Sequence, residues 1–165
     1  MSDSTSTDRS NRVEQALSLR WPVAVVVVLF TVSYPANDFE GLNSPWHHHG
    51  EDDTSATMLM IYTAIALVTA TVVFAKLMPW GINRGWGGVV ALTLSVAGLL
   101  LAPGFWTGIP PAVAAGGALL GWAGAGASAG AGAARGRRLS LAAFVIGVLG
   151  VIANVYSYAA VFFNI

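Results

Sequence analysis

The sequence predicts an all-α membrane protein with about five transmembrane helices and a cytoplasmic N-terminus. The first observation behind this prediction is composition, because 55% of the residues are hydrophobic and only 10% are charged. The mean hydropathy is +0.66, and soluble domains carry about 25% charged residues. The second is the placement of charge, since every Asp and Glu lies at or before Asp53. The third is a long run without any charged side chain, from Gly85 to Ala134.

Residues 1–15 are expected to form a disordered cytoplasmic tail, because they offer little apolar surface to offset the entropy lost on ordering. The first span is predicted at about residues 17–36. Its most apolar part, Trp21 to Tyr34, would be roughly 21 Å long as a helix and needs its flanks to cross a hydrocarbon core of ~30 Å. A secretory signal is the alternative, although cleavage after Ala36 would place Tyr34 where a small residue is needed. If this segment were cleaved or lay flat, about four spans would remain.

A polar loop at residues 37–55 follows the first span and must lie outside the bilayer, because it is rich in charged and turn-forming residues. It holds adjacent histidines and acids: His47, His48, His49, Glu51, Asp52 and Asp53. Their nitrogen and oxygen donors suit zinc, copper or nickel, and predict a weakly bound divalent metal. Three adjacent histidines in a loop do not converge easily on one ion. A solvated loop and a pH-responsive patch are therefore the competing interpretations.

The second span is predicted at residues 56–80, which is long enough to cross the bilayer. The uncharged run beginning at Gly85 would be roughly 75 Å long as one helix, more than two bilayer widths. It must therefore fold back where proline and glycine cluster, between Leu99 and Pro111. The predicted result is a third span at 88–103, a fourth at 110–133, a basic loop at Arg135 to Arg138, and a last span at 139–163.

The basic residues give an independent indication of orientation, because Lys and Arg in short loops favour the cytoplasmic side. With about five spans and a cytoplasmic N-terminus, all 8 Lys and Arg lie inside and the outside loops have none. The sidedness is the same if the first segment does not cross. The sequence thus predicts a multi-pass protein of the bacterial plasma membrane, in contact with the lipid bilayer.

The fourth predicted span contains glycines at four-residue spacing. Gly117 and Gly121 form one such pair, and Gly126 and Gly130 form another. Small residues at this spacing let a second helix backbone approach closely. These glycines are therefore predicted to pack helices, either within the chain or in a homo-oligomer.

Polar side chains inside the spans are few. Asn154 is expected to form hydrogen bonds between helices, with Thr63, Thr69 or Thr93 as candidate partners. The chain contains no cysteine, and no Asp or Glu follows Asp53, so a nucleophile with its base has no means of assembly within the spans. The sequence predicts no catalytic residues, no cofactor-binding residues and no enzyme activity. The absence of a basic groove studded with aromatic residues argues against nucleic acid as a partner.

The second half of the chain resembles a group of small, uncharacterised multi-pass membrane proteins of actinobacteria. The resemblance covers residues of about 90 to 155. It rests on the proline-punctuated hairpin, the Gly/Ala-rich helix, the basic loop Ala-Arg-Gly-Arg-Arg-Leu-Ser-Leu-Ala and the following Ile-Gly-Val-Leu-Gly-Val-Ile. It implies a membrane location without a catalytic residue to carry over.

These observations favour a non-enzymatic membrane protein that acts as an accessory or interaction subunit with a membrane-protein partner. The alternative is a transport or sensing component for a small molecule or metal ion, which would collect its ligand at residues 47–53. The two interpretations differ in one respect, because an accessory subunit needs a partner and a transport component binds its ligand alone.

Overall fold

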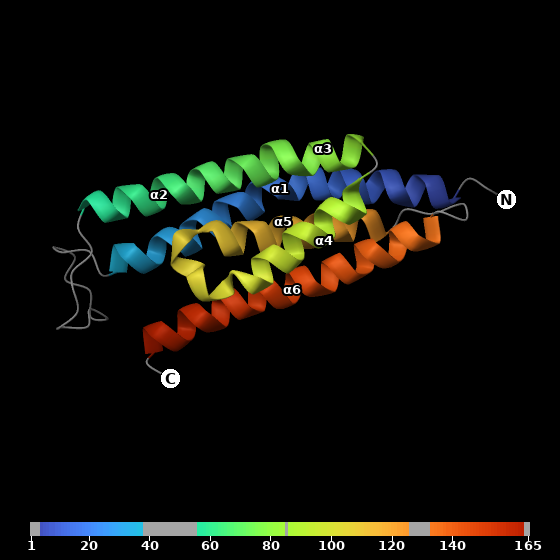
Figure 1. Ribbon diagram of the computed structural model, residues 1–165. Coiled ribbons are helices and arrows are strands. Elements are labelled where there is room, and N and C mark those ends of the chain that lie inside the picture. The colour runs from blue at the N-terminus through green and yellow to red at the C-terminus, as the bar shows by residue number, and fades with distance from the viewer. Residues whose placement is uncertain (1–3, 38–55, 85, 126–132, 164–165) are drawn as a thin grey trace.

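The computed structural model describes residues 4–37, 56–84, 86–125 and 133–163, and within these ranges every regular element is a helix (Figure 1). The predicted all-α class is confirmed. Three helical segments are long and apolar enough to cross a membrane, Ser10–Ser33, Ala56–Asn83 and Gly136–Ala160, and Gly87–Leu100 and Ile109–Ala125 are shorter apolar helices. This is the pattern of a multi-pass membrane protein.

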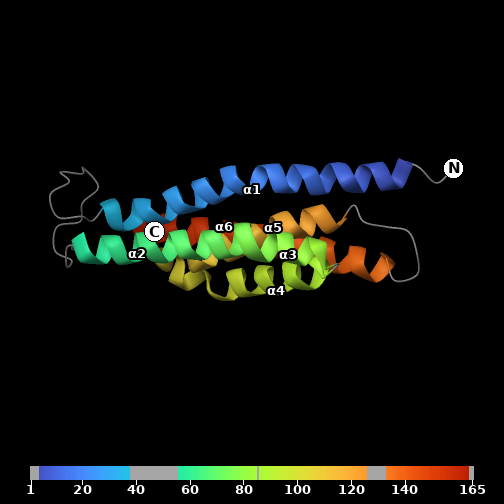
Figure 2. The same cartoon turned by 90° about the horizontal axis from the view of Figure 1, so that it is seen from above.

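Helix α1 spans Ser4–Asn37, so it overlaps the segment 1–15 that was expected to be a disordered tail. Extending an existing helix costs far less than nucleating one, which allows a polar segment to continue an apolar helix. Pro22 lies in the helix interior, where a missing N–H and a bulky ring bend a helix. Figure 2 shows α1 changing direction partway along its length. Beside this proline, the Arg20 guanidinium lies 5.4 Å from the centroid of the Trp21 ring.

The second apolar segment consists of α2 (Ala56–Ala70), the π-helix η1 (Thr71–Leu77) and α3 (Met78–Asn83) in direct succession. The Met78 N–H donates to the Val73 carbonyl, five residues earlier. Pro79 explains the wider turn, because in an α-helix its ring would clash with the carbonyl of Ala75 and leave it without a donor. The whole segment ends at Asn83, slightly beyond the predicted residue 80.

The uncharged run folds back as predicted, and the described part of each helix is shorter than the predicted span. Residues 126–132 of the predicted fourth span, 110–133, lie outside the described residues. Helix α4 spans Gly87–Leu100, the 3-10 helix η2 spans Ala102–Thr107, and α5 spans Ile109–Ala125. The two α-helices would be roughly 21 and 26 Å long, less than a ~30 Å hydrocarbon core. α4 ends before the predicted residue 103 because η2 takes over there. Pro110 and Pro111 occupy the first turn of α5, where their missing N–H groups have no intrahelical partner to lose.

Helix α6 spans Ala133–Phe163, so it begins before the predicted residue 139. Arg137 and Arg138 therefore lie on the first turns of a helix, where both are exposed, and not in a loop. Their long side chains favour helix and reach solvent from it, which removes the need for a loop at this point.

Helix α5 lies at the centre of the bundle. It contacts α1 and α2 on one side and α4 and α6 on the other, and Figures 1 and 2 show it enclosed by these helices. Among the residues whose burial is described, α5 has more buried ones than any other element, and they are mostly small: Pro110, Pro111, Ala112, Val113, Ala114, Ala115, Gly116, Gly117, Leu120, Gly121 and Ala123. The core is thus built around a helix with little side-chain volume.

The turn between α4 and α5 lies beside the interior of α1 and α2, and not beside the end of α1 at Asn37 or the start of α2 at Ala56. A Cβ added at Gly108 would lie 2.8 Å from side-chain atoms of Ala66 and Thr31. Those residues are ten and six positions from the ends of their helices, roughly 15 and 9 Å along the axes. Polar groups within the turn bond locally: Gly104 N donates to Leu101 O at 2.8 Å, and Thr107 Oγ1 donates to Gly104 O at 2.8 Å.

Candidate functional site

The predicted metal residues His47, His48, His49, Glu51, Asp52 and Asp53 lie outside the described residues, and so do Gly126 and Gly130. Within the described ranges no group of three or more His, Cys, Asp or Glu comes together. The other two predicted packing residues, Gly117 and Gly121, lie in α5. The structural features available for a functional argument are therefore the contacts of α5 with its neighbours.

Gly117 faces α4 and Gly121 faces α6. A Cβ at Gly117 would lie 2.6 Å from the Ser95 N atom, and one at Gly121 would lie 2.6 Å from the Phe144 N atom. Distances below 3.0 Å are too short for a real Cβ, so each glycine permits a backbone-to-backbone approach. The two glycines lie about 6 Å apart along α5 and about 40° apart around it, and each meets a different neighbouring helix. Both glycines are buried within the single chain.

Glycines on α4 and α6 complete the same junction from the other side. A Cβ at Gly98 would lie 2.5 Å from the Ala114 N atom, and one at Gly147 would lie 2.7 Å from the Ala118 N atom. Gly98 and Gly117 thus let α4 and α5 approach each other, and Gly121 and Gly147 do the same for α5 and α6. In a membrane, where apolar side chains gain nothing by leaving lipid, such close contact is a main source of helix association.

Two buried polar side chains link the helices of this junction. Ser95 Oγ on α4 donates to the Ala143 carbonyl on α6 at 2.7 Å, and Ser95 is fully buried. Sequence reasoning missed Ser95, although its spacing from Ala91 and Gly98 places all three on one helix face. That spacing was the signal available in the sequence.

Asn154 is also fully buried, but its partners are not the threonines that were expected. Its Nδ2 donates to the Gly150 carbonyl at 2.7 Å and makes a long contact of 3.5 Å with the Gly98 carbonyl. Thr63 instead donates to Leu59 in its own helix, and Thr93 is exposed. The Oδ1 atom of Asn154 has no hydrogen-bond partner among the described residues. Among the described residues, the hydrogen bond from Asn154 to another helix thus goes to a backbone carbonyl.

An aromatic cluster joins α1, η2 and α6 at the outer end of the bundle. The Tyr158 ring lies 4.9 Å from Phe30 and 6.0 Å from Phe105, centroid to centroid. Its hydroxyl also forms a 3.2 Å hydrogen bond with Ser33 Oγ. Tyr158 thus provides a contact between α1 and α6.

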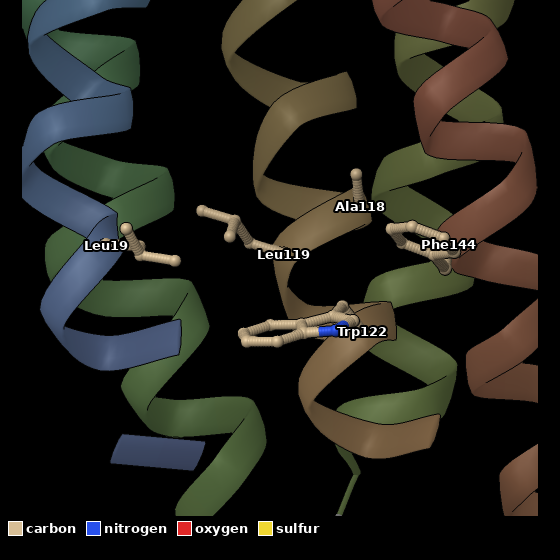
Figure 3. A pocket seen from close by; sticks show the side chains of 5 residues that line it. All are labelled: Leu19, Ala118, Leu119, Trp122 and Phe144. Atoms are coloured by element: carbon tan, nitrogen blue, oxygen red, sulfur yellow. The ribbon is translucent and has the colours of Figure 1, made fainter. Parts of the chain in front are cut away.

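A crevice of about 240 Å³ opens beside the contact of α5 with α6. It lies nearer the starts of α1 and α6 than the aromatic cluster does. Figure 3 shows side chains from α1, α5 and α6 around it. Its lining residues are apolar apart from one indole N–H: Leu19, Ala118, Leu119, Trp122 and Phe144. No acid or base lines it, so its chemistry is that of an apolar binding surface.

Comparison with models of protein families, with curated proteins and with solved structures found no match to this chain.

Proposed function

We propose that this chain is a non-enzymatic subunit of the bacterial plasma membrane that crosses the bilayer about five times and acts by binding a membrane-protein partner. The observation that carries the proposal is the packing of α5. Its backbone is in close contact with α4 and α6 through Gly98, Gly117, Gly121 and Gly147, so the centre of the bundle is occupied by protein. A molecule built in this way offers its lateral surface and its outer loop for interaction.

The distribution of charge supports the orientation. The N-terminus, the end of α3 and the start of α6 lie at the same end of the bundle (Figure 1). Arg12, Arg84 and Arg137 belong to these three segments, and Lys and Arg in short segments favour the cytoplasmic side. The outer polar segment, residues 37–55, contains neither. Short α4 and α5 count as crossings in this proposal, because a helix shorter than the bilayer is accommodated by local thinning or by its neighbours.

The chemistry of the chain agrees with a role other than catalysis. No acidic residue follows Asp53 and no cysteine occurs anywhere, so helices α2 to α6 carry neither a carboxylate nor a thiol for acid–base or nucleophilic work. Proton relays in membranes also depend on ionisable groups within the spans. An interaction subunit requires none of these groups.

The proposal is tested by purifying the full chain with a peptide epitope tag in a mild detergent, and by measuring co-purified proteins and bound metals by mass spectrometry. We expect one membrane protein at a fixed stoichiometry. A chain that purifies alone and retains zinc, copper or nickel would contradict the proposal. If that metal were lost in the triple variant His47→Ala, His48→Ala, His49→Ala, the transport or sensing alternative would take its place.

A further inference from the structure

The apolar crevice lies where α1 and α6 diverge. The two helices meet at the outer end, where Tyr158 contacts Phe30 and Ser33. Leu19 and Phe144, on opposite walls of the crevice, lie eleven and fourteen residues from that contact, roughly 16 and 21 Å along the helices. The crevice therefore occupies the half of the bundle near the basic ends, with α5 as its floor (Figure 3).

Each of the two helices that line the crevice, α1 and α6, carries an arginine seven residues before its crevice residue. Arg12 precedes Leu19 by seven residues on α1, and Arg137 precedes Phe144 by seven residues on α6. Seven residues make nearly two full helical turns, so each arginine lies on the same helix face as its crevice residue, about 10 Å farther toward the basic end. Arg137 is exposed and Arg12 is half-buried. On α1, Glu14 is about 140° around the helix from Leu19, and Asp8 precedes Arg12 by four residues on the same face. Helix α6 carries no acid, so Arg137 is the arginine placed to bind an anion.

This arrangement matches one class of ligand that a membrane supplies. A phospholipid places its phosphate at the membrane surface and its acyl chains below it, and arginine binds phosphate through several N–H groups. A cavity of ~150 Å³ lined by apolar side chains holds a benzene molecule. A crevice of about 240 Å³ therefore has room for a segment of one acyl chain and not for a whole lipid.

We propose that the crevice between α1 and α6 binds one acyl chain of an anionic phospholipid, whose phosphate lies beside Arg137. The lipid fills the gap left by the divergence of the two helices and holds α1 against α5. This inference rests on the proposed membrane location, but it requires neither a protein partner nor a particular orientation of the chain. Its failure and the failure of the proposed function are therefore separate results.

The test is native mass spectrometry of the purified full chain in detergent, after exposure to equal amounts of phosphatidylglycerol and phosphatidylcholine with the same acyl chains. We expect one phosphatidylglycerol molecule per chain to be retained in preference to phosphatidylcholine. Arg137→Gln is expected to lower that retention about fivefold, the effect of one arginine near a lipid surface. Arg84→Gln is the matched control, because Arg84 is exposed at the same end but on the C-cap of α3.

A second pair of variants tests the crevice itself. Leu19→Trp fills the space from one wall and should abolish retention of the lipid. Leu29→Trp makes the same change on α1 at a side chain that is 65% exposed and does not line the crevice, so it should retain the lipid. Equal binding of both lipids, equal loss in Arg84→Gln and Arg137→Gln, or full retention in Leu19→Trp would each overturn the proposal.

Discussion

Gly117 fixes how closely α4 approaches α5, because its missing side chain is the space that Ser95 occupies. The sequence pattern predicted that Gly117 and Gly121 pack helices, and it left open whether the second helix belongs to the same chain. The pattern did not identify the two neighbours, since small residues on α4 and α6 are equally compatible with either glycine. The spacing of Ser95 with Ala91 and Gly98 indicates a shared helix face, but it does not identify the partner of Ser95, because that acceptor is a backbone carbonyl.

Gly117→Val should destabilise the bundle by about 3 kcal/mol, the upper end of the usual cost of overpacking, because a Cβ at this position meets backbone atoms of α4. The measurement is the thermal midpoint of the purified protein in mild detergent. Gly136→Val is the control, since a Cβ at Gly136 meets no atom within 4 Å and the cost there is only that of helix propensity. Equal midpoints for the two variants would show that α4 and α5 do not touch at Gly117.

At the scale of elements, the sequence position of the turn between α4 and α5 was predictable. Its distance from the ends of α1 and α2 was not. Proline and glycine between Leu99 and Pro111 located the turn correctly. The depth of the turn, where Gly108 lies beside Ala66 and Thr31, depends on residues of other helices, which leave no local pattern. The π-helix Thr71–Leu77 was likewise not predicted, because its cause, Pro79, is also compatible with a kink or a helix end.

Gly108→Ala should destabilise the turn by about 2 kcal/mol. Gly108 has φ +77°, a left-handed conformation that costs an L-residue roughly 1–2 kcal/mol, and its Cβ would also press on Ala66 and Thr31. Gly104→Ala, in the same turn, is the control: its φ is −95° and a Cβ there meets nothing within 4 Å. Thermal midpoints in detergent measure both, and a smaller loss for Gly108→Ala than for Gly104→Ala would contradict this account of the turn.

At the scale of the whole molecule, the separation of charge and the alternation of apolar segments predicted the helical class and the order of the helices. They did not predict that α5 is the central helix, because its neighbours α4 and α6 are also apolar and rich in small residues. They also did not predict that α1 begins at Ser4, well before the expected start of the first span at about residue 17. A polar segment can continue a helix that already exists, so its own composition does not show where that helix begins. The outer loop with His47, His48 and His49 remains a prediction from sequence.

The central proposal is that the chain crosses the membrane about five times, with the basic ends of α1, α3 and α6 in the cytoplasm. The most direct test uses single cysteines, which would be the only thiols in a chain that has none. Ser10→Cys, Ser44→Cys and Gly136→Cys are expressed separately, and intact cells or spheroplasts are treated with a membrane-impermeant maleimide. The account predicts labelling of Ser44→Cys from outside, and labelling of Ser10→Cys and Gly136→Cys only after permeabilisation. Labelling of Gly136→Cys in intact cells, or protection of Ser44→Cys, would contradict it.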